Sequence, residues 1–189
     1  ADLFEIQTQD LYELVSHKAQ QAYDALRCPI LVEDSGLVFH AWKGLPGALV
    51  KWFETTVGCE GMLKMLQSFE NRRARAICCF ALHDGEKIQI VRGEVEGTIS
   101  NEICGDNGFG WDVLFIPEGY EKTYAEMSSK EKNAISFWYF RNKKLIAVDA
   151  INDGRAYMVA KRLIELGGSP DPFILSDPNF DLKSLLTRH

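Results

Sequence analysis

The stretch ILVEDSGLVFHAW, residues 30–42, decides the fold. Ile30-Leu31-Val32 is a short apolar run rich in β-branched residues, which predicts a central strand. We expect Glu33-Asp34-Ser35-Gly36 to form a turn, because Asp, Ser and Gly are favoured there, and the strand to resume at Leu37. Two carboxylates directly after a buried strand also lie where open α/β sheets tend to bind ligands. Taken alone, the pattern favours the turn over the ligand site.

An amphipathic helix is predicted before this strand, over residues 10–27. Asp10 can cap it, with Glu13 three residues later in a variant of the capping box, and Pro29 ends it. Its apolar stripe consists of Leu11, Leu14, Val15, Ala19, Ala22 and Leu26. Lys18 falls on the same face. Since an unpaired buried ammonium is costly, Lys18 must either extend to the edge of the stripe or meet an anion.

Helices and strands interleave downstream without strict βαβ periodicity. We expect helices at 46–55, 61–69 and 155–166 and strands at 74–83, 87–100 and 111–116. Asp84-Gly85 predicts a hairpin between the two long strands. The class is therefore α/β with a mixed sheet. We expect one domain over 1–150, with a helix and irregular tail at 151–189 packed on it.

Composition narrows the function. The 189 residues are 46% hydrophobic, enough for a core, and carry a formal charge of −6. That charge argues against a nucleic-acid polymer as partner, because phosphate contacts need a basic surface. The five cysteines show no CxxC spacing, which is typical of neither a disulfide framework nor a zinc site. No signal peptide or membrane-spanning run is evident, so we expect a cytoplasmic protein without a membrane partner.

Three polar segments could carry chemistry. In Gly108-Phe109-Gly110-Trp111-Asp112, the glycines let backbone approach a flat ligand, an aromatic ring can stack on a base and Asp112 can accept a hydrogen bond. A tight turn with core aromatics explains that segment equally well. Residues 129–133 and Lys51 are usually interpreted as solvated charges.

In chain order, several motifs closely resemble the inosine triphosphate pyrophosphatase (Ham1-like) family. The matching segments are Glu5-Ile6-Gln7, Val32 to Leu37, Gly44 to Gly47, Lys51-Trp52-Phe53, Gly108 to Asp112, Thr123 to Met127 and Glu131 to Ser136. The resemblance covers about residues 2–140. It implies an elongated α/β fold with a long mixed sheet, two lobes around a central cleft, and a homodimer. It also implies Mg²⁺-dependent hydrolysis of deaminated purine triphosphates to a monophosphate and pyrophosphate.

The resemblance also implies roles for individual residues. Glu5 and Asp34 match metal ligands, Asp34 is also proposed as proton acceptor for the attacking water, and Glu33 is a helper beside it. The residues that match substrate contacts are Lys18, Ser35, Lys51, Phe109, Gly110, Trp111, Asp112 and Lys132. An anion beneath the helix would then explain why Lys18 lies on an apolar stripe.

Two departures from the family pattern affect the expected activity. The family's Thr/Ser-x-Asn-x-x-Lys phosphate loop does not occur in this sequence, so either the sequence is truncated or a central strand is lost, with the tail beyond Ala150 as a candidate replacement. Phe137 and Trp138 stand where the family has a His-Arg pair that recognises the purine, and Arg141 is a candidate substitute. We therefore expect an altered base preference. The alternative is a nucleotide-binding or regulatory relative with impaired catalysis, or a structural partner with a vestigial cleft.

Overall fold

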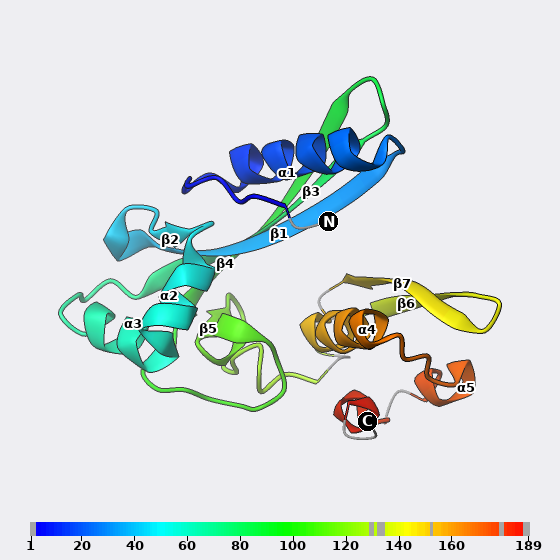
Figure 1. Cartoon of the computed structure of the whole chain (residues 1–189). Coiled ribbons are helices and arrows are strands. Elements are labelled where there is room, and N and C mark those ends of the chain that lie inside the picture. Colours follow the sequence, from blue (N-terminus) through cyan, green and yellow to red (C-terminus); the bar gives the residue numbers. More distant parts are fainter. Residues whose placement is uncertain (1–2, 129–130, 132–134, 152, 178–179, 187–189) are drawn as a thin grey trace. The chain divides into compact units, whose positions relative to one another are not determined.

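The structure, a computed structural model, divides the chain into two compact units (Figure 1). It describes residues 3–128, 131, 135–151, 153–177 and 180–186. The first unit comprises Ala1–Cys104 and Gly110–Thr123, and the second comprises Gly105–Phe109 and Tyr124–His189. The predicted division at residue 150 falls inside the second unit.

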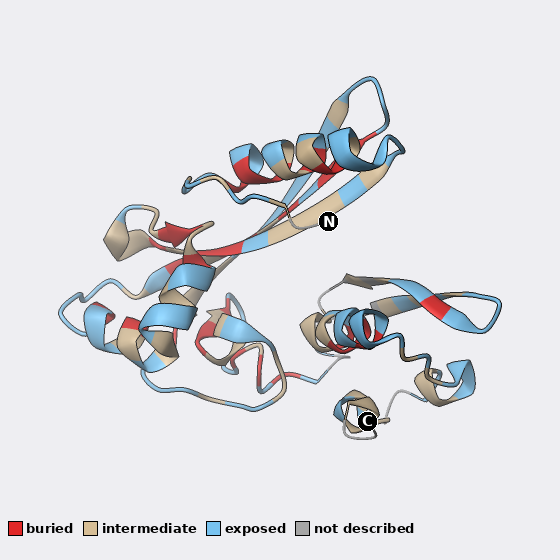
Figure 2. Ribbon diagram, in the orientation of Figure 1, coloured by how far each residue is buried: buried red, intermediate tan, exposed pale blue. Residues whose placement is uncertain are grey.

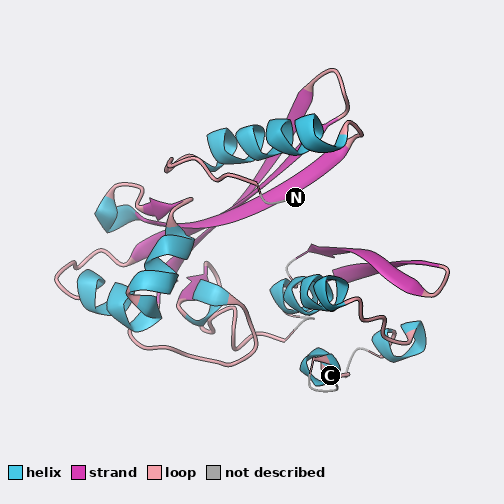
Figure 3. Cartoon of the chain, viewed as in Figure 1, coloured by secondary structure: helices cyan, strands magenta, loops and turns pink. Residues whose placement is uncertain are grey.

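The first unit is built on a five-stranded antiparallel sheet in the order β2-β1-β3-β4-β5 (Figure 3). The strands are β1 (Ile30–Phe39), β2 (Pro46–Gly47), β3 (Arg73–His83), β4 (Ile88–Ile99) and β5 (Phe115–Pro117). The predicted hairpin between the two long strands, β3 and β4, is confirmed. In its turn, the Asp84 carboxylate accepts the backbone N–H groups of Glu86 and Lys87.

The turn predicted at Glu33–Gly36 is wrong, because β1 runs straight through it. Asp34 is paired with Cys79 and Gly36 with Ile77 in an unbroken ladder with β3. This ladder satisfies the backbone groups that a turn would leave to solvent. A Cβ on Gly36 would lie 2.8 Å from the carbonyl oxygen of Gly47. The glycine is therefore needed for the close approach of β2 and not for a change of direction.

Helix α1 (Leu11–Leu26) covers one face of the sheet, packing on β1 and β3 (Figure 2). Asp10 caps it as predicted, accepting the N–H of Tyr12. Glu13 accepts a hydrogen bond from the Thr8 hydroxyl. The core beneath the helix consists of Leu11, Leu14, Val15, Ala19, Ile77, Cys79 and Ala81.

Two further helices of the first unit confirm the predicted ones with shifted bounds, α2 (Val50–Thr56) and α3 (Gly58–Leu66). The expected start at Pro46 is wrong, because Pro46 and Gly47 pair with β1 as β2. The 3-10 turns η1 (His40–Trp42) and η2 (Gly110–Val113) complete the unit.

The second unit is a hairpin covered by a helix. Strands β6 (Ile135–Arg141) and β7 (Lys144–Ile151) pair with each other, and the predicted helix is confirmed as α4 (Gly154–Leu166), which packs on β7. Its core is Leu145, Val159, Ala160 and Leu163. Two short turns follow, α5 (Pro172–Leu175) and η3 (Leu182–Leu185). Within the described residues, the chain after β7 forms helices and turns, and the role of the tail beyond Ala150 as a candidate replacement for a lost strand stays a prediction.

Within the described part of the chain, no helix combines the length and apolarity needed to cross a bilayer.

Candidate active site

Lys18 and Asp34 lie on facing surfaces of α1 and β1. Lys18 comes three residues after Val15 and one before Ala19, both fully buried against the sheet. Asp34 of β1 is paired with Cys79 of β3, and directly opposed residues share a face of the sheet. Because Cys79 belongs to the core under α1, Asp34 is on the face that this helix covers.

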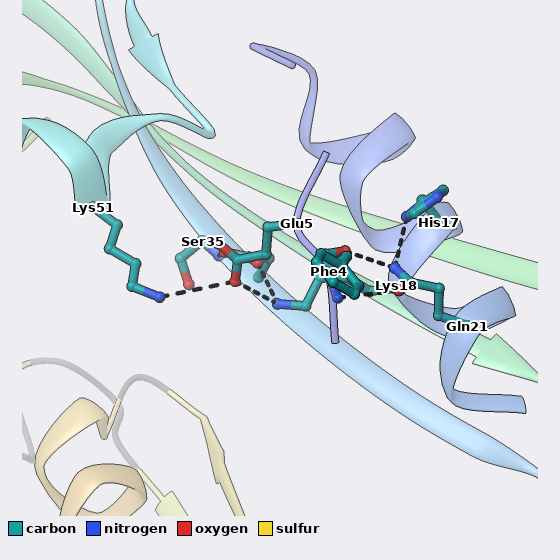
Figure 4. A network of polar contacts seen from close by, with 8 residues as sticks. Phe4, Glu5, His17, Lys18, Gln21, Ser35 and Lys51 are labelled. Carbon is teal, nitrogen blue, oxygen red and sulfur yellow. Dashed lines mark hydrogen bonds and ion pairs between the residues drawn. The ribbon is translucent and has the colours of Figure 1, made fainter. Parts of the chain in front are cut away.

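Four charged side chains are linked here by ion pairs, and we call Glu5, Lys18, Asp34 and Lys51 the charge cluster. Figure 4 labels Glu5, Lys18 and Lys51 of this cluster. The Lys18 Nζ lies 2.6 Å from Asp34 Oδ2 and 3.5 Å from Glu5 Oε1. The Lys51 Nζ lies 3.9 Å from the same Glu5 oxygen. Glu5 comes from the segment before α1 and Lys51 from α2, so separate parts of the chain converge. The predicted meeting of Glu5 and Asp34 is observed, with Lys18 between them.

The two carboxylates keep Lys18 protonated. Burial alone would lower the pKa of Lys18, but the hydrogen bond to Asp34 and the negative charges of Asp34 and Glu5 outweigh it, so the pKa is raised. The Lys18 side chain is only 15% exposed. The helix therefore presents a permanent, shielded positive charge to whatever lies at the sheet face at neutral pH.

Gln21 holds the Glu5 segment in place, and the motifs gave no sign of it. Its side chain donates to the Phe4 carbonyl at 2.6 Å and accepts the Phe4 N–H at 3.1 Å (Figure 4). Its Nε2 also lies 2.8 Å from His17 Nδ1. Its spacing in the sequence could have indicated Gln21, because it follows Lys18 by three residues and so lies on the same side of α1.

Glu33 points away from the charge cluster. It accepts a hydrogen bond from the Ser35 hydroxyl at 2.6 Å and one from the Cys78 thiol at 3.2 Å. Side chains alternate across a strand, so Glu33 and Ser35 share the face opposite Asp34. Burial, together with the charge of Glu33, raises the pKa of Cys78. Only the backbone N–H of Ser35 approaches the cluster, donating to Asp34 Oδ1 at 3.0 Å.

The expected base loop is divided between the two units. Gly110, Trp111 and Asp112 lie in η2 of the first unit, and Phe109 belongs to the second. Lys132 lies outside the described residues.

Glu54 of α2 supports η2 and was not foreseen from the sequence. A Cβ on Gly110 would lie 2.6 Å from Glu54 Oε1. Burial raises the pKa of Glu54, the backbone N–H of Trp111 counteracts the rise, and the charge of Asp112 adds to it. Burial and the charge of Glu54 also raise the pKa of Cys59 to about 11. No local pattern connects residues 54 and 110, so only the tertiary structure could reveal this contact.

Glu5 and Asp34 fit Mg²⁺ better than a metal held by protein alone. Among the residues that the structure describes, no three His, Cys, Asp or Glu side chains form a group that could hold a metal ion. Mg²⁺ usually takes one or two carboxylates and completes its shell with water and substrate phosphates. Two carboxylates that converge on one cation, here the Lys18 ammonium, supply the oxygen donors that such an ion needs.

Comparison with known proteins shows to which family the chain belongs. The sequence profile of the Ham1 family matches residues 1–148, which include the whole charge cluster. The chain belongs to the Ham1 family.

Relatives of this Ham1 protein include proteins named as pyrophosphatases. It is 44% identical over 151 residues to inosine triphosphate pyrophosphatase 2 of Trypanosoma cruzi, covering 79% of this chain and 76% of the relative. It is 42% identical over 136 residues to a dITP/XTP pyrophosphatase of Hyperthermus butylicus, covering 72% of each.

Solved structures confirm the predicted α/β class of this Ham1 chain. A nucleoside-triphosphatase, or dITP/XTP pyrophosphatase, from Mycobacterium abscessus aligns with a TM-score of 0.63 at 26% identity, over 70% of this chain and 74% of that one. The Ham1 protein of Staphylococcus aureus aligns with a TM-score of 0.62 at 28% identity, over 70% and 72%.

The end of the Ham1 chain also matches a second family. The profile described as Reductase C-terminal covers residues 116–186 and overlaps the Ham1 match up to residue 148. This segment contains Phe137 and Trp138. Trp138 packs against the core of the second unit and donates to the Ser136 hydroxyl at 3.1 Å, while Phe137 is 48% exposed. Both aromatic residues thus lie on β6 of the hairpin that α4 covers. Arg141, the last residue of β6, is exposed.

Proposed function

We propose that the chain hydrolyses deaminated or otherwise non-standard purine nucleoside triphosphates to the nucleoside monophosphate and pyrophosphate. The observation that carries the proposal is the convergence of Glu5 and Asp34 on Lys18. Two relatives that are named inosine triphosphate pyrophosphatases are each 44% identical to this chain over the aligned residues.

In the proposed site, Glu5 and Asp34 would hold Mg²⁺. When bound, the ion would neutralise phosphate charge and orient water. Lys18 exchanges part of its pairing with the carboxylates for phosphate oxygens, and Lys51, 71% exposed, contacts the triphosphate from α2. Outside the described residues, Lys132 is proposed as a further phosphate contact.

The proposed reaction is an in-line displacement at the α phosphorus. Water forms the new P–O bond while the bond to the bridging oxygen between the α and β phosphates breaks. Asp34 takes the proton of the attacking water, and the electron pair leaves with pyrophosphate, whose charge Lys18 and Lys51 offset. The Ser35 N–H keeps the Asp34 carboxylate oriented. Glu33 faces away, so we assign it no direct part in the step.

Base recognition is assigned to Phe109, Gly110, Trp111 and Asp112. Phe109 is 50% exposed, which leaves ring surface for stacking. Asp112 would accept hydrogen bonds from the purine edge. Without the family's His-Arg pair, a broader base preference is proposed than that of an inosine-specific enzyme.

A second candidate is a nucleotide-binding relative without catalysis. The packing of Trp138 into the core of the second unit favours it, because that residue stands where the family has a purine-reading arginine. Nucleotide would then raise the melting temperature without any release of pyrophosphate.

The deciding assay measures pyrophosphate release from ITP, XTP, dITP, ATP and GTP with Mg²⁺. Turnover of at least one, abolished by Asp34→Asn, supports the pyrophosphatase. Nucleotide-dependent stabilisation without turnover of any of them supports the second candidate. If the protein shows no turnover and is not stabilised by any nucleotide, both candidate functions are refuted.

We also propose a homodimer, as the family resemblance implies, and a cytoplasmic location, because the five cysteines show no pattern typical of a disulfide framework. Light scattering of the purified chain tests the oligomeric state, and a monomer would contradict it.

A further inference from the structure

The segment Gly105–Phe109, which leads into the proposed base loop, is bound tightly within the second unit. The Asn107 N–H donates to the Ala125 carbonyl at 3.0 Å, and the Asn107 side chain donates to the Met127 carbonyl at the same distance. Gly105 has a φ of +83°, and a Cβ there would lie 2.5 Å from the Ala125 carbonyl carbon. The segment therefore has one side packed against residues 125–127.

Two cations also contact one carbonyl of this segment. The Asp106 carbonyl accepts a hydrogen bond from Arg155 Nη2 at 3.3 Å and another from Lys183 Nζ at 3.5 Å. Arg155 lies in the first turn of α4 and Lys183 in η3. The Arg155 Nε is buried and has no hydrogen-bond partner among the described residues. Arg155 therefore makes this contact while its Nε has no acceptor among the described residues.

Helix α4 also comes close to Phe109. A Cβ on Gly154, the first residue of the helix, would lie 3.2 Å from the Phe109 Cβ. Contact at that distance is tight, so the glycine lets the helix end approach the aromatic residue. Arg155 and Gly154 lie beyond residue 148, in the part that the Reductase C-terminal profile matches and the Ham1 profile does not.

We propose that Arg155 is a positioning residue for base recognition, fixing the Asp106 carbonyl so that Phe109 is presented to a purine ring. The inference rests on the proposed function in assigning Phe109 to the base. It gives the segment after residue 148 a specific task, since the first turn of α4 supports a loop that belongs to the Ham1 part of the sequence.

The test compares Arg155→Ala with Arg162→Ala, a control on the same helix. Arg162 is 57% exposed and pairs only with Glu165 among the described contacts. Hydrogen exchange is measured on a peptide covering residues 105–109, and kinetics are measured with ITP and with inorganic tripolyphosphate, which has no base. Arg155→Ala should speed exchange of that peptide and raise KM for ITP about 10-fold, with kcat within about twofold. Its KM for tripolyphosphate should match that of the control, and Arg155→Lys should recover part of the loss.

Two results would overturn the inference. One is equal exchange of residues 105–109 in the Arg155→Ala and Arg162→Ala proteins. The other is a rise in KM that is the same for tripolyphosphate as for ITP, which would indicate general damage. If the wild-type chain hydrolysed no triphosphate, the proposed function would fail separately. Exchange of residues 105–109 would then still decide whether Arg155 holds the loop.

Discussion

The Nζ of Lys18 lies 2.6 Å from Oδ2 of Asp34, joining a helix residue to a strand residue 16 positions along the chain. The contact exists because α1 lies across β1 and because β1 continues through Asp34. It combines a cation that the apolar stripe cannot accommodate alone with a carboxylate that the sheet face cannot bury alone. Lys18 keeps its charge at neutral pH, because its pKa is raised.

Replacing Lys18 by Met should destabilise the protein. It leaves Glu5 and Asp34 partly buried without their shared ammonium, at a cost of about 2 kcal/mol in the free energy of unfolding. Because the Lys18 pKa is raised in the folded state, this stabilisation is present at neutral pH and is lost only as pH rises through that pKa, above about 10.4. Urea unfolding measures it. The exposed Lys64→Met is the control, and equal stability of the two variants would contradict the prediction.

The two neighbouring carboxylates of β1 should differ in their effect on catalysis. Asp34→Asn should lower kcat/KM for the best triphosphate more than about 100-fold, since it removes the proposed proton acceptor. Glu33→Gln, on the opposite face with Ser35 and Cys78, should stay within about threefold. Steady-state pyrophosphate release checks both. A loss for Glu33→Gln as large as that for Asp34→Asn would return Glu33 to the catalytic site.

Glu5→Gln should raise the Mg²⁺ concentration needed for half-maximal turnover by about 10-fold, because the proposed metal site loses one of its two charged oxygen ligands. Chelation with EDTA should abolish activity in both proteins, and added Mg²⁺ should restore it. Glu60→Gln, an exposed change on α3, serves as the control. An unchanged Mg²⁺ requirement in Glu5→Gln would remove Glu5 from the metal site.

Glu54 should make stability depend on pH. Its pKa is raised by burial, so the unfolded chain releases this proton at lower pH than the folded chain does. Stability therefore falls as pH rises from the ordinary Glu value, about 4.3, through the raised pKa, and is level above it. Glu54→Gln cannot ionise and should melt at a higher temperature than wild type at pH 7 and at a similar temperature near pH 4. The same difference in melting temperature at both pH values would contradict this.

Gly110→Ala should couple to Glu54. Alanine at a φ of +55° costs about 1 kcal/mol, and its Cβ would also lie 2.6 Å from Glu54 Oε1. The single variant should lose about 2 kcal/mol or more, and the loss should fall toward about 1 kcal/mol in a Glu54→Ala background. Thermal or urea unfolding of the four proteins completes the double-mutant cycle. Additive losses would mean that the carboxylate moves aside freely.

Local patterns predicted several of the regular elements. Periodicity and capping gave α1 and its Asp10 cap, and the Asp84-Gly85 dipeptide gave the β3–β4 hairpin. The prediction was wrong at Glu33–Gly36 because residues that favour turns also occur in strands. Here the pairing with β3 satisfies their backbone hydrogen bonds, and Gly36 leaves room for the backbone of β2. That partner, β3, lies more than forty residues away in the sequence.

The candidate site divides in the same way. The sequence by itself determined which residues carry charge, and it marked Lys18 as a cation on an apolar stripe that needed an anion. Only the tertiary structure decided that Asp34 and Glu5 supply it, that Glu33 faces the other way, that Glu54 lies against Gly110, and that Arg155 contacts the Asp106 carbonyl. The reason is physical. Helical and strand periods depend on neighbours a few residues apart, whereas contacts between charges depend on how distant segments pack, which no local pattern encodes.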